Sequence, residues 1–350
     1  MNNGQTCVII TYAYNAEKTI ARTIESILSQ TYINWVYYIL DNGSTDNTGD
    51  IIRKYAEQHT RIIPLSNKFN HVFEEGNHPN EILAKHNPDD WFCSLDSDDE
   101  YKPGFLENMI NFVNENNLDI AACGIDYIDS ASGQFMYVRA LNQNLILDSP
   151  KDYNDYFTKY HGFMRSTWCK LYKIAIIHKQ NSSRQHGELL YGGDTTHTIE
   201  HFRNASRIGI LAKSLHKYYV SLKTFSYKLD NTRIESDRIL DDVARDFLDE
   251  KCGIISKENN DFLQLLYFNA IYDTCIVVLA TNIPLLEKYA MILNIFASEH
   301  TQELLLWNGY MDKKKQLSTM IVEWIQKQND SQHSHENNDV VAKIYTAIGL

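Results

Sequence analysis

The apolar run Trp91-Phe92-Cys93-Ser94-Leu95 leads directly into the acidic stretch Asp96-Ser97-Asp98-Asp99-Glu100. Two carboxylates about 5 Å apart repel by roughly 3 kcal/mol at an effective dielectric constant near 20. Because side chains alternate along a strand, we expect Asp96 and Asp98 on one side and Asp99 on the other. Oxygen ligands on one side suit a hard divalent cation that also binds phosphate oxygens. The alternative, a solvated acidic turn, would be the better interpretation of an isolated Asp-x-Asp.

Two earlier strands also end in polar turns, which argues against that alternative. The first strand leads into Tyr14-Asn15-Ala16-Glu17, and Asn15 is expected to cap a helix whose apolar stripe contains Ile20, Ile24, Ile27 and Leu28. The second leads into Asp41-Asn42-Gly43-Ser44-Thr45-Asp46, where Gly43 allows a tight turn and Ser44 or Asp46 is expected to cap the next helix. Open α/β sheets bind ligands at such carboxyl ends of strands.

The alternation of elements predicts an α/β fold with a mostly parallel sheet flanked by helices. We expect strands at 6–12, 35–41, 61–65, 91–96 and 119–127, and a further strand within 133–141. Helices are expected at 16–29, 46–58, near 80–87 and at 104–116. From about Ser236 the pattern is helical, with a polar linker at 328–338. We therefore divide the chain into an α/β domain over 1–230, with halves 1–130 and 131–230, and a C-terminal helical region over 236–350.

Charge and cysteine content exclude several classes of protein. The net charge of −12 over 350 residues argues against nucleic acid as a partner, and an anionic ligand would need a bound cation to invert the local field. The six cysteines form no CxxC pair, which indicates a reducing cytosol without disulfides or structural zinc.

No signal peptide or membrane span is expected. The N-terminus lacks the charged and apolar regions of a signal peptide. The best transmembrane candidate, at 262–280, contains Gln264, Asn269 and Asp273, so a buried helix explains it better.

Four segments together resemble the family 2 glycosyltransferases of the GT-A fold, a large inverting family that uses nucleotide-sugars. They are Tyr14-Asn15-Ala16-Glu17, Ser26-Ile27-Leu28-Ser29-Gln30-Thr31-Tyr32, Asp41-Asn42-Gly43-Ser44-Thr45-Asp46 and Leu95-Asp96-Ser97-Asp98-Asp99, in the family's order and approximate spacing. The resemblance covers residues 5–130, extends to about residue 230 and is absent beyond. It implies that 1–130 binds the nucleotide-sugar and that 131–230 faces the acceptor.

The resemblance implies a site for the donor and a metal ion. Asp98 would bind Mn²⁺ or Mg²⁺ directly, Asp96 would support the metal or the ribose, and Asp99 would be a supporting or structural residue. Tyr14 matches the position that stacks on the nucleobase, with a core aromatic as its alternative reading. The other implied nucleotide-sugar-binding residues are Thr11, Tyr12, Glu17, Asp41, Asn42 and Ser97.

This chain departs from the family pattern at three places. Asn42 stands where a second Asp often accepts a hydrogen bond from uracil, and its amide group offers an uncharged acceptor or a donor instead. The family's Arg-Asn pair is missing between 66 and 90, where Lys68 or Lys85 is the available cation. Gly193 stands where Glu is common, before Asp194.

Asp194 is the residue that the resemblance implies as the catalytic base. An inverting transfer needs a base for the acceptor hydroxyl, and Asp194 matches its position in the family; an N-cap role can coexist with that role. His197 and His201 have a spacing that can bind zinc, but a polar helix face is the favoured interpretation.

The sequence therefore predicts a metal-dependent inverting glycosyltransferase of polysaccharide biosynthesis. It would transfer a sugar from a nucleotide diphosphate, with UDP favoured, to a glycan or lipid-linked glycan. The alternatives are a catalytically silent nucleotide-sugar-binding or scaffolding protein and, less favoured, a sugar nucleotidyltransferase.

The expected location is cytoplasmic, with any membrane contact peripheral to the inner face. Lys313-Lys314-Lys315 precedes an apolar stripe of Leu317, Met320, Ile321, Trp324 and Ile325. This stripe has three alternative interpretations. It lies on a membrane surface, it packs within its own domain, or it forms a homodimer through the C-terminal helices.

Overall fold

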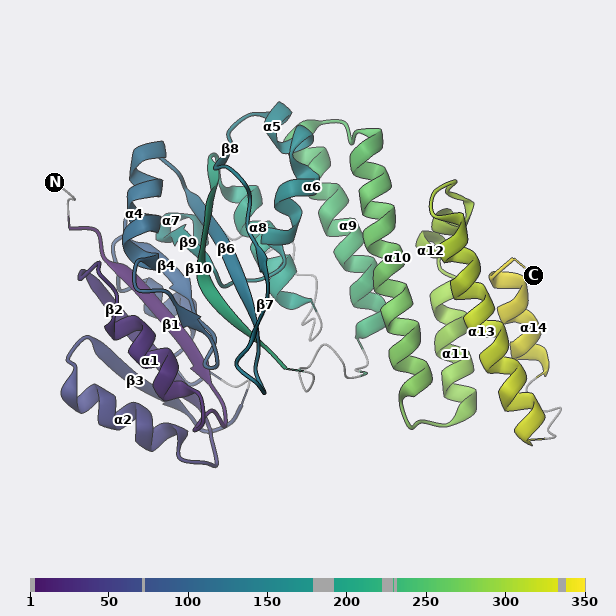
Figure 1. The fold of residues 1–350 in the computed structure, drawn as a ribbon, viewed down its shortest axis with the longest axis horizontal. Helices are drawn as coiled ribbons and strands as arrows, with labels where there is room; N and C mark the ends of the chain where they lie inside the picture. The colour runs from purple at the N-terminus through teal and green to yellow at the C-terminus, as the bar shows by residue number, and fades with distance from the viewer. Residues whose placement is uncertain are drawn as a thin grey trace. The chain divides into compact units, whose positions relative to one another are not determined.

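The computed structural model of the chain describes residues 4–70, 73–178, 192–221, 229, 232–332 and 338–349. These residues form two compact units (Figure 1). The α/β unit extends to residue 222, and the helical unit begins at residue 223 and includes a short segment that ends at Gly193.

The α/β unit alternates strands and helices through its first half, as the sequence predicts. Its elements there are β1 (Cys7–Ala13), α1 (Ile20–Leu28), β2 (Trp35–Asn42), α2 (Thr48–Gln58), β3 (Ile62–Asn67), α3 (Pro79–Leu83), β4 (Trp91–Ser94), β5 (Glu100–Tyr101) and α4 (Phe105–Asn116). The second half contains β6 (Ile120–Asp129), β7 (Phe135–Arg139), β8 (Leu145–Leu147), α5 (Pro150–Asp155), α6 (Phe157–Tyr160), the 3₁₀ helix η1 (His161–Met164), β9 (Lys170–Lys173), α7 (Ile174–Ile177), α8 (Gly193–Asn204) and β10 (Ile208–Val220).

All ten strands form one mixed sheet, in which the order β3-β2-β1-β4-β9-β6-β10-β5 forms the main path. The pairs β1–β2, β2–β3, β1–β4 and β6–β10 are parallel, which confirms the predicted α/β fold with a mostly parallel core. Because Ala13 pairs with Asp41, the turns that follow β1 and β2 lie side by side.

The main core lies between this sheet and helices α1 and α4. Ile20, Ile24 and Ile27 of α1 are fully buried, so the predicted apolar stripe of this helix is confirmed. Burying each such side chain stabilises the fold by about 1.5–3 kcal/mol. All six cysteines are free thiols.

Strand β7 extends the sheet beyond β9. Residues 120–122 of β6 pair with β9, and residues 125–128 of β6 pair with β7. Its other edge pairs with β10 along its whole length, with register shifts near Ser214. The amino-terminal half of β6 thus joins the main path of the sheet through β9, and its carboxyl-terminal half lies between β7 and β10.

Two predicted helix caps are wrong. Helix α1 begins at Ile20 with Thr19 as its N-cap, and Asn15 adopts a left-handed conformation with φ of 50° in the preceding loop. Helix α2 has Asn47 as its N-cap, although the Asp46 carboxylate still accepts a hydrogen bond from the Thr48 amide at 3.0 Å. Both predicted caps instead have side chains that bond within or between loops.

The helical unit consists of α9 (Arg233–Cys252), α10 (Lys257–Ala280), α11 (Leu285–Phe296), α12 (Glu299–Leu306), α13 (Met311–Gln332) and α14 (Asn338–Ala347). Within the described residues, α10 is the one helix long and apolar enough to span a membrane. Its residues Phe268, Ile271 and Cys275 belong to the buried core of this unit, as the predicted buried helix requires. The predicted linker at 328–338 is wrong at its start, because α13 continues to Gln332; 333–337 lies outside the described residues.

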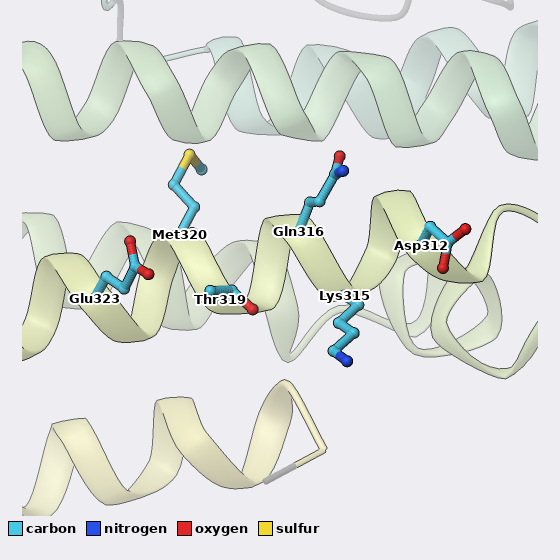
Figure 2. Close-up of a pocket in the computed structure, with 6 residues that line it drawn as sticks. All are labelled: Asp312, Lys315, Gln316, Thr319, Met320 and Glu323. Carbon is cyan, nitrogen blue, oxygen red and sulfur yellow. The ribbon is translucent and has the colours of Figure 1, made fainter.

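The apolar stripe of α13 packs within the helical unit. Leu317, Ile321 and Ile325 are buried in its core, and the ammonium group of Lys314 donates to the carbonyls of Leu304 and Leu305. This stripe is therefore not a membrane-binding face. Figure 2 shows residues that line a pocket along α13, which are Asp312, Lys315, Gln316, Thr319, Met320 and Glu323. These residues all come from one helix and include no cluster of catalytic or metal-binding groups.

Candidate functional site

Hydrogen bonds join the loops that follow β1 and β2. The Asn15 amide donates to Ser44 Oγ at 3.0 Å, and the Thr45 amide donates back to Asn15 Oδ1 at 2.8 Å. The Glu17 carboxylate accepts from Asn47 Nδ2 at 2.8 Å, while the Glu17 amide donates to Asp46 Oδ2 at 3.1 Å. These bonds fix the two loops relative to each other. Glu17, which we assigned to nucleotide-sugar binding, thus has a bonded partner within the protein.

Tyr14, Tyr12 and Thr11 differ sharply in exposure. Tyr14 is 47% exposed, so it is not a core aromatic packed under the sheet. Tyr12 is half-buried and makes an edge contact with Phe73, with ring centroids 5.9 Å apart. Thr11 is fully buried, donates to the Leu95 carbonyl at 2.6 Å and accepts from the Tyr37 hydroxyl at 2.8 Å. Of the three, Tyr14 has the side chain most open to a ligand.

Asp41 organises the turn that follows β2. Its Oδ1 accepts from the Ser44 amide at 3.0 Å, and Gly43 in this turn has a φ of +74°. A Cβ atom at Gly49 would lie only 2.5 Å from Asp41 Oδ2, so glycine lets the first turn of α2 approach this carboxylate.

Asn42 begins a chain of three side-chain amides. Asn67 Nδ2 donates to Asn42 Oδ1 at 2.7 Å, and Asn77 Nδ2 donates to Asn67 Oδ1 at 2.9 Å. All three side chains are buried. The oxygen of Asn42 thus has a partner inside the protein, and its amide nitrogen is the group that remains to contact a ligand.

The carboxylates of Asp96, Asp98 and Asp99 lie together where β4 ends. One oxygen from each lies within 4.8 Å of the others. Asp98 is exposed, Asp96 and Ser97 are half-buried and Asp99 is fully buried. Burial raises the pKa of Asp96, and the charges of Asp99, Asp194 and Asp98 raise it further. The site therefore concentrates negative charge.

This cluster has the properties of a divalent-cation site. Within the described parts of the chain, no Lys or Arg nitrogen lies within 4.0 Å of the Asp96 or Asp98 carboxylate. Hard cations prefer such oxygen ligands, and a cation would offset the repulsion that, after burial, raises the pKa of Asp96. The residues present therefore fit Mn²⁺ or Mg²⁺.

Asp99 anchors the cluster to β10. Its Oδ1 accepts from the Tyr219 amide at 2.9 Å, and its Oδ2 lies 2.9 Å from His216 Nε2. Burial lowers the pKa of His216 to about 3, so the imidazole is neutral at pH 7. Asp99 is thus buried, yet one of its oxygens lies within 4.8 Å of oxygens of Asp96 and Asp98. The predicted separation of Asp99 from the other two is wrong, because β4 ends at Ser94 and strand alternation does not extend to these residues. The sequence analysis assigned no role to His216 or Tyr219.

Arg22 is a further residue at the site that the sequence analysis missed. Its Nη2 donates to the Asp98 carbonyl at 2.5 Å, and its Nε lies 3.2 Å from Glu100 Oε1. Its guanidinium lies over the Tyr219 ring, 3.6 Å from the centroid. Lys68 and Lys85, the cations available by sequence, are both exposed. On sequence alone Arg22 is one polar residue of an amphipathic helix, and only the fold brings it to the acidic cluster.

Asp194 lies in the first turn of α8 and reaches the same site. Its charge contributes to the raised pKa of Asp96. Crowding by protein atoms raises the pKa of Asp194 itself, and the nearby charges of His197 and Lys170 oppose that shift. A carboxylate with a raised pKa is a stronger base, so this arrangement is suited to accept a proton. His201, buried and neutral with a pKa lowered to about 3, does not share the environment of exposed His197.

Lys170 holds the segment that precedes β9. Its buried ammonium donates to the carbonyls of Ser166 at 2.5 Å and Trp168 at 3.1 Å. Thr198 of α8 also donates to the Ser166 carbonyl, at 2.8 Å. These bonds fix the start of α8, and with it Asp194, against β9.

Comparison with known proteins agrees with this geometry. Residues 8–180 match the model of the family described as Glycosyl transferase family 2. An uncharacterized glycosyltransferase of Escherichia coli K12, YibD, is 28% identical over 225 residues, which are 63% of this chain and 63% of that protein. WfgD of E. coli, named a UDP-Glc:alpha-D-GlcNAc-diphosphoundecaprenol beta-1,3-glucosyltransferase, is 30% identical over 141 residues, 40% of this chain and 54% of WfgD. The chain thus spans less than two thirds of the length of both relatives.

A solved structure has a similar fold over most of the chain. The crystal structure of Staphylococcus aureus TarS 1–349 in complex with UDP-GlcNAc matches with a TM-score of 0.56 at 16% identity, over 86% of this chain and 89% of that one. The family match includes the turns that follow β1, β2 and β4, whereas Asp194 and β10 lie beyond its last residue. Residues 8–180 form a domain of glycosyltransferase family 2, and the α/β unit that contains them has the GT-A fold.

Proposed function

We propose that this protein transfers a sugar from a UDP-sugar to a hydroxyl group of a glycan or lipid-linked glycan, with inversion at the anomeric carbon. The observation that carries this proposal is the cluster of Asp96, Asp98 and Asp99, together with the charge of Asp194, from a distant part of the chain, which helps to raise the pKa of Asp96. A cation site beside a base is the combination that the reaction needs.

Asp98 and Asp96 would hold Mn²⁺ or Mg²⁺ in this proposal. The ion would supply positive charge to the diphosphate oxygens as the leaving group departs. Tyr14 would stack on the base, Asp41 and Asn42 would contact the nucleoside, and Arg22 would add positive charge near the diphosphate. UDP is favoured because the TarS structure contains UDP-GlcNAc and WfgD is named for UDP-Glc.

Asp194 would accept the proton of the acceptor hydroxyl as that oxygen attacks the anomeric carbon. The bond between the sugar and the diphosphate breaks, and the diphosphate leaves with the electron pair. General base catalysis of this kind typically contributes about 10²–10⁴-fold. We propose a cytoplasmic enzyme, in which any membrane contact is peripheral.

The direct test is UDP release from UDP-Glc, UDP-GlcNAc, UDP-Gal and UDP-GalNAc with Mn²⁺, in wild type and the Asp194→Asn variant. We expect at least one donor to be turned over by wild type and slowed in the variant. Nucleotide binding without turnover of any donor, together with no effect of Asp194→Asn, would instead favour a silent nucleotide-sugar-binding protein.

A further inference from the structure

Three tyrosines lie in register across three neighbouring strands of the sheet. Tyr218 of β10 pairs with Tyr127 of β6, which pairs with Tyr137 of β7. The rings of Tyr127 and Tyr137 stack with centroids 4.3 Å apart and an interplanar angle of 13°, and Tyr218 meets Tyr127 edge-on at 5.5 Å. We call these three residues the tyrosine row.

The tyrosine row connects the acidic cluster with an exposed edge of the sheet. At its inner end, Trp168 stacks on both Tyr218 and His216, at 4.9 and 4.7 Å, and His216 contacts Asp99. Tyr127 in the middle is buried, whereas Tyr137 at the outer end is 49% exposed. The row therefore offers a ligand one accessible ring, rigidly supported from below and close to the proposed site of transfer.

Two arginines, Arg139 and Arg165, flank the row. Arg139 follows Tyr137 on the same face of β7, and its guanidinium lies 5.2 Å from the Tyr127 ring centroid. Its Nη1 donates to the Gly162 carbonyl at 3.2 Å. Arg165 is exposed at the end of η1. Among the residues that the structure describes, neither guanidinium lies within 4.0 Å of a carboxylate, in contrast to Arg22, Arg203 and Arg207.

The charges of both arginines act at one place. After burial, they are the causes that lower the pKa of His161 to about 3, and both also oppose the raised pKa of Tyr127. A chain with a net charge of −12 thus keeps two uncompensated positive charges beside its aromatic row. Guanidinium groups are well suited to bind phosphate oxygens in pairs.

We propose that Tyr137, Arg139 and Arg165 form an acceptor subsite for a saccharide whose reducing-end sugar carries a phosphate or diphosphate. The apolar face of the sugar packs on the Tyr137 ring, and the phosphate oxygens bind the two guanidinium groups. This inference rests on the proposed function, because it places the acceptor beside Asp194 and the acidic cluster. It defines the acceptor class by the anionic group that the acceptor carries. The three residues that would bind this acceptor lie outside the motifs identified from the sequence.

The test measures binding of defined acceptors to the full chain in the presence of UDP and Mn²⁺. The probes are short alkyl diphosphate glycosides of GlcNAc, GalNAc, glucose and galactose, the neutral alkyl glycosides of the same sugars, and an alkyl glucuronide. By titration calorimetry, we expect one or more diphosphate glycosides to bind about tenfold or more tightly than the neutral glycoside of the same sugar. Arg139→Gln and Arg165→Gln should each remove about tenfold of that preference, and Tyr137→Ala should weaken both classes.

Two variants are matched controls. Arg61→Gln removes another guanidinium that lies over an aromatic ring, 3.6 Å from the Trp35 centroid. Val138→Ala truncates the residue next to Tyr137; Val138 is 50% exposed and lies on the opposite face of β7. Both should bind the probes as wild type does. Equal binding of diphosphate and neutral glycosides, a preference for the glucuronide, no binding of any probe, or no effect of the arginine variants would each overturn the proposal. Stabilisation by UDP with Mn²⁺, measured without acceptor, reports separately on the proposed function.

Discussion

The two sides of the site differ in the chemistry of their side chains. On the side formed by the ends of β1, β2 and β4, short polar groups such as Asn15, Asp41 and Asn42 bond to neighbouring loops and strands. On the side formed by β6, β7 and β10, aromatic rings stack across strands, and Arg139 and Arg165 have no carboxylate partner within the described part of the chain. We call these the donor side and the acceptor side.

This difference follows from what each side is proposed to bind. Amide and carboxylate groups fixed by neighbouring loops suit a nucleoside and a cation, whose donors and acceptors have definite directions. Aromatic rings offer large apolar area with few hydrogen-bonding demands, which suits a sugar ring. The acidic cluster lies where the two sides meet, and the following predictions test that division from the largest expected effect to the smallest.

The largest effect is expected for Asp98→Ala. Removing the exposed carboxylate should lower turnover by a factor on the order of 10⁴, because the cation would lose its direct ligand. This factor corresponds to a loss of several kcal/mol of transition-state stabilisation. The free energy of unfolding without metal should stay the same or rise, because a repulsive charge is removed. Steady-state UDP release and chemical denaturation measure the two quantities. Turnover equal to wild type would contradict the metal assignment.

Asp194→Asn separates the acceptor from the donor. The amide cannot take the acceptor proton, so kcat should fall by about 10²–10⁴-fold while binding of UDP with Mn²⁺ stays unchanged. Thr195→Ser, at the neighbouring position of α8, is the control and should keep its turnover. If Asp194→Asn weakened UDP binding as strongly as it slowed transfer, Asp194 would belong to the donor side.

Asp99→Ala should affect folding more than Asp98→Ala does. It leaves the half-buried Tyr219 amide and the buried His216 Nε2 without their partner, which should lower the free energy of unfolding by about 3 kcal/mol. Asp99→Asn, which keeps a polar group at this position, should lose less. Urea denaturation of the variants without metal measures these free energies of unfolding. Equal stability of Asp98→Ala and Asp99→Ala would contradict the structural role of Asp99.

Acid should destabilise the acceptor side through its buried neutral histidines. Burial lowers the pKa of His201 from 6.5 to about 3, so the unfolded chain binds a proton that the folded chain excludes between those pH values. Below pH 6.5, protonation of His201 stabilises the unfolded chain and not the fold. The free energy of unfolding is therefore fully retained above pH 6.5 and falls as pH falls toward 3. From pH 7 to pH 5, wild type should lose about 2 kcal/mol more than His201→Leu. Parallel stability curves for the two proteins would show that His201 is protonated in the fold.

The smallest effect is expected on the donor side, for Tyr14→Ala. Loss of a stacking ring typically costs about 0.5–1.5 kcal/mol, so UDP should bind up to about tenfold more weakly. Acceptor KM should not change, and Tyr14→Phe should bind UDP as wild type does. A change in acceptor KM alone would assign Tyr14 to the acceptor side.

The donor side was the easier one to predict from sequence. There, each polar turn directly follows its own strand. The position of Asp41, Asp96 and Asp98 at the ends of the strands can therefore be predicted from a few neighbouring residues. The caps failed because Asn15 bonds to Thr45 of another loop, a contact that local sequence does not encode.

The acceptor side depends on contacts between distant segments. Tyr127, Tyr137 and Tyr218 become one row only through the register of three strands, and the pairing of β6 with β10 contains register shifts. Arg22 and His216 likewise reach the acidic cluster from a helix face and from the last strand of the sheet. Asp194 is predicted only from the family resemblance, since nothing in its neighbouring residues predicts that its charge acts on Asp96.

The central claim is that the acidic cluster binds a nucleotide diphosphate together with a divalent cation. The most direct measurement is thermal unfolding with UDP, GDP, dTDP and CDP, each with and without Mn²⁺, for wild type and Asp98→Ala. A nucleotide at about 100 times its dissociation constant should add roughly 2.7 kcal/mol to folding stability. We predict stabilisation by UDP that requires Mn²⁺ and disappears in Asp98→Ala. Stabilisation that is independent of the metal, or that persists in the variant, would contradict the account.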